Sequence, residues 1–513
     1  MRNLLAICWF MAAIGAAGCA VGPDYHTPKV PVSGAFDPGH GYPATQPATR
    51  PAQPEQWWTS LADRELNSLV DRATKANLDL GIAIARLGEA RSQRYVVAAD
   101  WWPGAAIDGA AGKSSGTNAT RGRVDGPLNA ASNTRNVKTI TMLGGFDATW
   151  EIDLFGRVTR AVQAADADAQ AFAEARNQIL VTLVADVVRA YMHLRSTQHR
   201  LEIARQYVDV EQHTLDLVRR KLSMGLTTEV DLALAEREIE SARATIPPLV
   251  AETAVSQRQI AVLLGGDPQA LYAELDRATP LLAVPTVVWL GEPSALLRRR
   301  PDIRQAERQL ASATAQIGVA TADLFPRISL SGGFGLQYEG SWFAPTDVRN
   351  IYSWGPSVRW PLLDFGRLEA VLQVQDWRTR QMLLNYRKTI EFAVQEVDDS
   401  LGRFEAEQDR LQRLQKAAVA SDRAAKLTAM RYQRGLTDFL NVLDAQRQLF
   451  SLEDQAVVSQ EAAVVNWASL NKALGRGWET IAPGLEPPSK PPGISPPVEL
   501  ITSGLAGAQH ANK

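Results

Sequence analysis

The chain of 513 residues has few of the features that small cross-linked proteins and nucleic-acid-binding proteins need. Its two cysteines cannot build a disulfide framework. Its 54 basic residues are balanced by 56 acidic residues, so the basic surplus expected of a nucleic-acid-binding surface is missing. No apolar run reaches the ~20 residues of a membrane-spanning helix. These absences exclude a disulfide scaffold and a polytopic inner-membrane protein, and they argue against a nucleic-acid partner.

Proline is missing from two long stretches, 129–246 and 362–482, although the chain holds 28 prolines. Eight of them lie between Pro23 and Pro54, and seven lie between Pro483 and Pro497. An interior proline destabilises a helix by ~3 kcal/mol or more. The two proline-free stretches therefore predict very long helices flanked by irregular ends.

Motifs of enzymatic chemistry are also missing. The sequence has no phosphate-binding loop with lysine and no zinc motif, and its six histidines are scattered. The triplet Asp364-Phe365-Gly366 imitates a kinase metal motif, but its counterpart in the repeat described below is Leu154-Phe155-Gly156. We therefore expect no enzyme activity and assign no catalytic residue, cofactor or metal.

The N-terminus has the pattern of a bacterial export signal. Arg2 precedes an apolar run from Leu4 to Ala17, and small residues precede Cys19. Cysteine at this position resembles the lipid-attachment site of bacterial lipoproteins, and Ala20 after it resembles an outer-membrane address. We predict lipidation at Cys19. The alternative is ordinary signal cleavage, in which Cys19 has no role.

An internal duplication dominates the rest of the chain. A shift of 210 residues aligns Trp150 with Trp360, Phe155-Gly156-Arg157 with Phe365-Gly366-Arg367, and Gly225-Leu226-Thr227 with Gly435-Leu436-Thr437. The register continues without a gap to Leu264-Gly265 and Leu474-Gly475. The two halves are therefore repeats of one unit.

Each repeat predicts a long helical hairpin. Apolar residues such as Val394, Val397, Leu401 and Phe404 follow the alternating spacing of packed helices. A continuous helix from Arg157 to Leu222 would be ~100 Å long. Glycine at 225 and 435 can close such a helix, and the threonine two residues later can cap the next. The returning helix of the first repeat should break at Pro247-Pro248.

Before each long helix, the apolar pattern changes to a period of two. Even positions from Ile140 to Ile152 are apolar or small, and Tyr352 to Trp360 repeats this pattern. Partner strands surround Phe334 and, with a weaker pattern, Ile107. Alternation over ~10 residues is typical of membrane β-barrel strands, although a half-buried soluble hairpin has the same pattern. Aromatic residues at the strand ends predict a membrane-interface girdle: Trp101, Trp102, Trp150, Phe325 and Trp360.

Four strands cannot close a barrel, and open edges in a membrane would leave backbone groups unsatisfied. We therefore expect oligomers. Core packing at the junction is the alternative explanation for Phe155 and Phe365.

Specific motifs now identify a family resemblance. The stretch from Arg299-Arg300-Pro301-Asp302 to Leu324-Phe325-Pro326 resembles the central signature of TolC-like outer-membrane efflux proteins, in the OprM/NodT lipoprotein branch. Residues 432–437 and 442–447, Asp153 to Arg157, and Val21 to Tyr25 also fit, and the resemblance covers about Cys19 to Trp478. It implies an α+β membrane protein whose duplicated units form a trimeric 12-stranded β-barrel, four strands per protomer, continued by a periplasmic α-helical tunnel.

The resemblance also implies function and partners. Such proteins are passive exit ducts of tripartite pumps that conduct small molecules such as drugs. The implied partners are two further copies, a periplasmic adaptor, an inner-membrane transporter of the RND type, and outer-membrane lipid. Two alternatives remain: the duct of a type I polypeptide secretion system, and an exported coiled-coil protein that does not conduct.

Site residues follow from the matched motifs. Leu440 and Asp444 match the ring positions of the periplasmic aperture, and Arg447 is a plausible restraining partner of Asp444. The first-repeat equivalents Val230, Leu234 and Arg237 lack the carboxylate. The expected adaptor-docking turns are Gly225, Leu226 and Thr227 in the first repeat and Gly435, Leu436 and Thr437 in the second. The alternatives are that Leu440 packs against a neighbouring helix, that Asp444 is an ordinary surface charge, and that the turns are capped but bind no partner.

The expected organisation starts with a signal peptide at 1–18 and a lipidated extended strap at 19–57. The first repeat spans 58–265, with a helix, a strand hairpin near 103–152 and long helices. A linker at 266–294 follows. The second repeat spans 295–478, with its strand hairpin near 327–362, and a proline-rich tail occupies 479–513.

Overall fold

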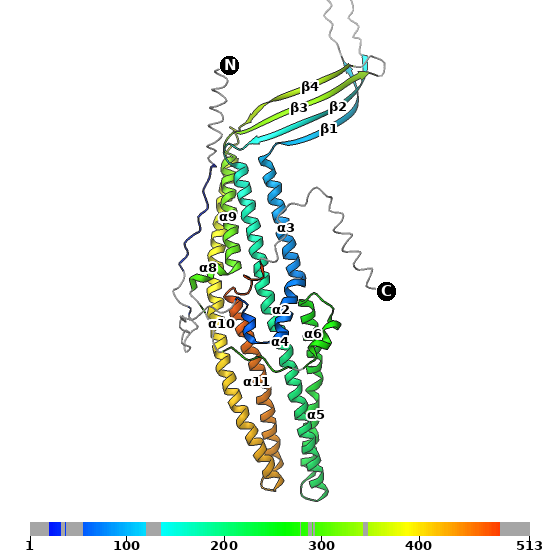
Figure 1. Cartoon of the computed structure of the whole chain (residues 1–513), viewed down its shortest axis with the longest axis vertical. Coiled ribbons are helices and arrows are strands. Elements are labelled where there is room, and N and C mark those ends of the chain that lie inside the picture. The colour runs from blue at the N-terminus through cyan, green and yellow to red at the C-terminus, as the bar shows by residue number, and fades with distance from the viewer. Residues whose placement is uncertain are drawn as a thin grey trace, which may run out of the picture. The chain divides into compact units, whose positions relative to one another are not determined.

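The computed structural model describes residues 20–31, 36, 55–118, 135–277, 279–285, 290, 293–341 and 347–482. The duplication is visible in its longest helices (Figure 1). Helix α4 (Arg157–Ser223) and helix α10 (Arg367–Gln433) each have 67 residues, and both ends differ by the 210 residues of the repeat. The predicted long helices are confirmed, and Cys19 and residues 483–513 of the predicted C-terminal tail lie outside the described residues.

One antiparallel sheet holds the strands of both repeats in the order β1-β2-β3-β4 (Figure 1). Its strands are β1 (Gly104–Asn118), β2 (Arg135–Ile152), β3 (Arg327–Ser341) and β4 (Asp347–Arg359). The register places Ile107 opposite Phe146, Phe146 opposite Phe334, and Phe334 opposite Tyr352. Because side chains alternate along a strand, this register collects the apolar set on one face and the polar set on the other.

The chain forms two compact units, and each takes segments from both repeats. The first contains residues 1–27, 90–169 and 308–383, and therefore the whole sheet. The second contains residues 28–89, 170–307 and 384–513, which include the turns of both helical hairpins and most of α4 and α10. Pairing of β2 with β3 explains why the repeats do not fold as separate bodies, since each completes the sheet of the other.

Glycine ends both long helices, as the sequence predicts. Gly225 and Gly435 both have φ of 71°, the left-handed region that favours glycine. The predicted caps are wrong. In the first turn Thr228, not Thr227, caps the next helix through a capping box with Asp231, and in the second Asp438 precedes the helix without a side-chain cap. The reason is local: Thr227 donates its hydroxyl to Asp231 at 2.6 Å, and Thr437 accepts from Asn441 at 3.0 Å.

The returning helices differ between the repeats. The first is broken into α5 (Glu229–Ala244) and α6 (Ile246–Leu263), with the two prolines at the start of α6. The second, α11 (Phe439–Ala473), runs for 35 residues without a break. Proline lacks the backbone donor that an uninterrupted helix needs, which explains the break.

Shorter helices complete the two units. They are η1 (Trp57–Leu61), α2 (Arg64–Ala76), α3 (Leu78–Ala98), η2 (Ala99–Trp101), α7 (Pro268–Leu275), η3 (Pro293–Ala295), α8 (Leu296–Arg299) and α9 (Pro301–Ala322). Within the described residues of the predicted linker, α7 is the one α-helix, and η3 begins at the end of the linker. No helix in the described part of the chain is both long and apolar enough to cross a membrane.

The central signature around Arg300 has a structural role. Its buried guanidinium contacts Asp302 at 2.6 Å and Glu396 at 2.8 Å, and donates to the carbonyl of Ala473 at 2.6 Å. A Cβ added to Gly475 would lie 2.9 Å from the Arg300 Cα, so glycine is needed at this contact. The motif thus joins the start of α9 to α10 and to the end of α11.

Candidate gate, docking turns and strand junctions

Leu440 and Asp444 lie on the exposed face of α11, one turn apart. Leu440 keeps 59% of its surface exposed, and Asp444 is also exposed. Their neighbours Phe439, Val442 and Leu443 are buried in a core with Leu215, Ile239 and Tyr432. One face of α11 therefore holds the helices together, while the face with Leu440 and Asp444 is free for contacts outside the chain.

Arg447 does not pair with Asp444 as expected; it pairs with Glu238 of α5. Its Nε lies 2.7 Å from Glu238 Oε2, and its other guanidinium nitrogen Nη2 also contacts that oxygen. Helical spacing suggested a partner on the same helix, whereas packing of the two hairpins brings a carboxylate from the other repeat. Arg447 therefore links the two hairpins, and Asp444 has no ion-pair partner among the described residues.

Glu238 is the centre of a buried polar cluster. The Tyr207 hydroxyl of α4 donates to its Oε1 at 2.8 Å, and the Tyr207 ring stacks on Phe450 of α11 at 4.5 Å. Burial alone would raise the pKa of Glu238, but hydrogen bonds from Arg447 and Tyr207 lower it below its usual value. Glu238 is thus an anion that three helices share.

A second carboxyl, Glu211 of α4, lies fully buried beside this cluster. Neither of its oxygens has a hydrogen-bond partner in the described structure. Burial, and then the negative charge of Glu238, raise the pKa of Glu211 to about 7, although Tyr207 and Arg447 oppose the shift. Sequence reasoning missed Glu211 and Glu238, because no spacing along one helix shows which side chains meet between hairpins.

Lys221 makes a second link between the hairpins, close to their turns. Its ammonium nitrogen donates to the Tyr432 carbonyl at 2.7 Å and lies 3.7 Å from the centre of the Tyr432 ring. A cation over an aromatic face is attracted by the negative π surface. The end of α4 is therefore held against the end of α10.

Both predicted docking turns expose apolar side chains. Leu226 is 68% exposed and Leu436 is 62% exposed, although both residues are leucines that burial would favour. A Cβ added to Gly225 or Gly435 would meet no atom within 4 Å. The tips are therefore small, apolar and open, which suits a partner surface.

At the strand ends the aromatic residues form matching contacts in both repeats. Trp150 donates its indole hydrogen to the Trp101 carbonyl at 3.0 Å, and Trp360 donates to the Leu324 carbonyl at 3.1 Å. Phe325 is partly exposed and stacks on Phe155 at 4.7 Å, whereas Trp102 is 73% exposed.

The two phenylalanines considered for core packing therefore differ within one chain, because Phe155 is half-buried whereas Phe365 is not buried at all. Phe365 is fully exposed, with φ of 53°. Within one chain, Phe155 has Phe325 beside it, and no ring contact of Phe365 is found among the described residues.

Arg160 fastens the segment that follows Cys19, a role that the sequence did not reveal. This arginine, with 5% of its side chain exposed, pairs with Asp24 at 2.9 Å and donates to the Val21 carbonyl at 3.1 Å and the Gly22 carbonyl at 3.2 Å. Gly22 packs on Gly318, where an added Cβ would lie 2.5 Å from backbone. The only sequence signal is that Ala370, the repeat counterpart of Arg160, cannot make these bonds.

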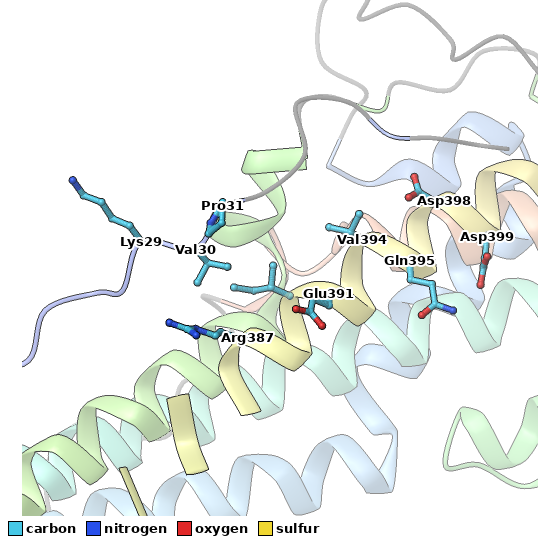
Figure 2. Close-up of a pocket in the computed structure, with 10 residues that line it drawn as sticks. Lys29, Val30, Pro31, Arg387, Glu391, Val394, Gln395, Asp398 and Asp399 are labelled. Atoms are coloured by element: carbon cyan, nitrogen blue, oxygen red, sulfur yellow. The ribbon is translucent and has the colours of Figure 1, made fainter. Parts of the chain in front are cut away.

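Further along the segment, Lys29 to Pro31 border a groove of about 760 Å³ beside α10 (Figure 2). The α10 side lies between Arg387 and Asp399 and carries the carboxylates of Glu391, Asp398 and Asp399. The described residues contain no cluster of side chains suited to a metal ion.

Comparison with known proteins agrees with this geometry. A family model described as outer membrane efflux protein matches residues 69–266 and 293–476. Nodulation protein T of Rhizobium leguminosarum bv. trifolii is 30% identical over 474 residues, which cover 91% of this chain and 96% of that protein. A toluene efflux pump outer membrane protein, TtgC of Pseudomonas putida, is 29% identical over 479 residues, covering 93% and 96%.

A solved structure of the outer-membrane channel OprN matches with a TM-score of 0.78 and 34% identity, covering 90% of this chain and all of that one. The predicted fold class, that of the trimeric barrel-and-tunnel channels of this family, is confirmed. The chain therefore belongs to the outer membrane efflux protein family and is an efflux channel of the bacterial outer membrane that extends into the periplasm.

Proposed function

We propose that three copies of this chain form the passive exit duct of a tripartite pump and gate it at the turns of the second helical hairpin. The observation that carries this proposal is the exposed pair Leu440 and Asp444 on a helix whose opposite face is fully packed. A side chain that only stabilised the hairpin would lie in the core. Instead, these two positions are available where copies of α11 converge.

In the trimer, Leu440 gives an apolar constriction and Asp444 gives a ring of three carboxylates. Carboxylates held close together repel one another, so the closed ring should respond to bound cations. Arg447 with Glu238 and Lys221 with Tyr432 hold the closed state, because each joins the first hairpin to the second. Opening requires these two links to break or slide.

The proposed duct has no catalytic group and takes its energy from its partners. A periplasmic adaptor docks on the apolar tips at Leu226 and Leu436, and an RND-type transporter of the inner membrane supplies the substrate. We propose small molecules as that substrate, which the name of the toluene efflux relative supports.

Single-channel recording of the purified trimer in planar bilayers tests the gate. Asp444→Ala removes the ring charge, and Leu440→Ala widens the apolar constriction. Both variants should raise the conductance severalfold over the parent channel, because each removes side-chain atoms from the narrowest part of the duct. Asp409→Ala is the matched control, because Asp409 pairs with Arg413 on its own helix α10 at 2.9 Å. Unchanged conductance in both gate variants, in trimers that assemble normally, would refute the gate.

A further inference from the structure

Helix α11 of the second hairpin lies directly over a buried carboxyl on α4 of the first hairpin. Glu211 has none of its surface exposed, and Tyr207 and Thr214 lie one turn before it and one turn after it on the same face of α4. Phe450 of α11 stacks on Tyr207 at 4.5 Å, and Gln446 of α11 donates to the Thr214 hydroxyl at 3.1 Å. These contacts flank Glu211, so α11 covers the carboxyl for as long as the second hairpin stays against the first.

The hydrogen-bond donors that face Glu211 are used by another carboxylate. The charged and titratable side chains around it are Tyr207 on α4, Glu238 on α5 and Arg447 on α11. The single hydroxyl hydrogen of Tyr207 goes to Glu238 at 2.8 Å, and Arg447 Nε donates to the same carboxylate at 2.7 Å. Arg237 of α5 also lies 4.0 Å from Glu238. Neither oxygen of Glu211 has a hydrogen-bond partner in the described structure.

A second buried acceptor beside α4 also lacks a donor. Gln446 binds Thr214 through its amide nitrogen, but its carbonyl Oε1 is buried without a partner among the described residues. An ionised Glu211 could only accept hydrogen bonds and would add to this deficit, whereas a protonated carboxyl is itself a donor. Burial, and then the negative charge of Glu238, raise the pKa of Glu211 to about 7. The neutral form of Glu211 is therefore the one that fits this packing.

We propose that Glu211 is a proton-binding site that keeps the gate closed. While α11 covers it, the carboxyl holds its proton. When α11 moves away from α4, water reaches Glu211, its O–H bond breaks and the proton passes to water. This inference rests on the proposed function, in which opening breaks the link between Arg447 and Glu238, and it adds the regulation of that gate.

The direction of the pH effect follows from the two environments of Glu211. A carboxyl with a usual pKa of 4.5 in water and a pKa of about 7 under α11 binds more protons in the closed arrangement between these values. The closed arrangement is therefore favoured at low pH, and this advantage is lost as the pH rises through the interval. From pH 5.5 to pH 8.5, the ratio of open to closed arrangements should rise by roughly 30-fold for each copy.

Single-channel recording in planar bilayers at these two pH values tests the site. The recordings use the Asp444→Ala channel, because the carboxylates of the Asp444 ring would also titrate. This channel should spend a larger fraction of time in its highest conductance level at pH 8.5 than at pH 5.5. Adding Glu211→Gln should hold that fraction at its low, acidic value at both pH values, because an amide cannot ionise. The matched control adds Glu202→Gln, an exposed position on α4, and should keep the full pH response.

Infrared difference spectra between the parent trimer and the Glu211→Gln trimer give a readout besides conductance. The parent should show the carbonyl band of a protonated carboxyl at pH 5.5. This band should decrease as the pH passes through about 7, the pKa of the covered Glu211. The difference between the parent and Glu202→Gln should show no such band.

Two outcomes would overturn the proton site while leaving the gate intact. One is an Asp444→Ala channel whose pH response is absent, or is the same with and without Glu211→Gln. The other is a difference spectrum that shows Glu211 already ionised at pH 5.5. The proposed function fails separately, if Leu440→Ala and Asp444→Ala both conduct like the parent.

Discussion

At the scale of single residues, Glu211 is a buried carboxyl whose ionisation the fold opposes. A carboxyl with a usual pKa of 4.5 and a folded pKa of about 7 binds more protons in the folded chain than in the unfolded chain between these values. Stability therefore falls as the pH rises through this interval. The difference corresponds to ~3 kcal/mol for each copy.

The variant Glu211→Gln should remove this dependence, because an amide cannot ionise. We expect its melting temperature, followed by the helical circular dichroism of detergent-solubilised trimer, to exceed that of the parent at pH 8.5 and to approach it at pH 5.5. Glu202→Gln, an exposed position on the same helix, should change neither value. Equal pH dependence in Glu211→Gln and the parent would show that Glu211 is not neutral in the folded chain.

Single residues also show where sequence reasoning ends. Spacing along one helix was enough to place Leu440 and Asp444 on a common face, and the structure shows that this face is exposed. The same reasoning gave Arg447 the wrong partner, because Glu238 lies in the other repeat, 209 positions away. The sequence did not reveal Glu211, because a buried glutamate cannot be distinguished from an exposed one until the packing of the neighbouring helices is known.

At the scale of elements, the sequence predicted the helix ends that proline and glycine set. It did not predict which residues cap the following helices. The absence of proline and the presence of glycine set the ends of α4 and α10, because both act on the backbone of their own residue. Capping depends on which of several neighbouring side chains accepts the hydrogen bonds of the free backbone N–H groups at the start of the helix. Thr227 and Thr228 compete for Asp231, and the sequence alone does not decide between them.

The turns also carry the prediction about the adaptor. Gly435→Leu would add a bulky side chain to a residue with φ of 71°, which costs about 1–2 kcal/mol, while meeting no atom of its own chain. Trimers should therefore assemble, but efflux in whole cells should fall to the level of a strain without the channel. Gly266→Leu, an open position at the end of α6, is the control and should export normally. Normal efflux by Gly435→Leu would exclude this turn as the docking site.

At the scale of the whole molecule, the duplication gives a chain that cannot pair all of its backbone hydrogen-bonding groups by itself. Two hairpins give a sheet with two open edges, and an edge strand in hydrocarbon leaves backbone groups without partners. The sequence showed the strands and hence the need for further copies. It could not show the pairing register, because register becomes visible only when β2 is seen against β3.

The lipid anchor predicted at Cys19 belongs to the same scale, because it would attach the protein to the membrane in addition to the barrel. Arg160 and Asp24 fix the chain directly after Cys19 to the unit that contains the sheet, so lipid attached there would remain close to that unit. A diacylglycerol group would itself hold the chain at the membrane, but a closed barrel needs no anchor to remain inserted. Lipidation should therefore be dispensable for the trimer.

Metabolic labelling with an alkyne fatty acid tests this prediction. The parent should be labelled, and Cys19→Ser behind a signal peptide of the ordinary cleavage type should lose the label while its trimers still fractionate with the outer membrane. A second variant, Arg160→Ala, should keep the label and make the segment after Cys19 sensitive to protease, because Asp24 and three carbonyls lose their donor. A label that persists in Cys19→Ser would place the lipid elsewhere. Loss of trimers in that variant would show that the anchor contributes to assembly and that the sheet alone does not secure it.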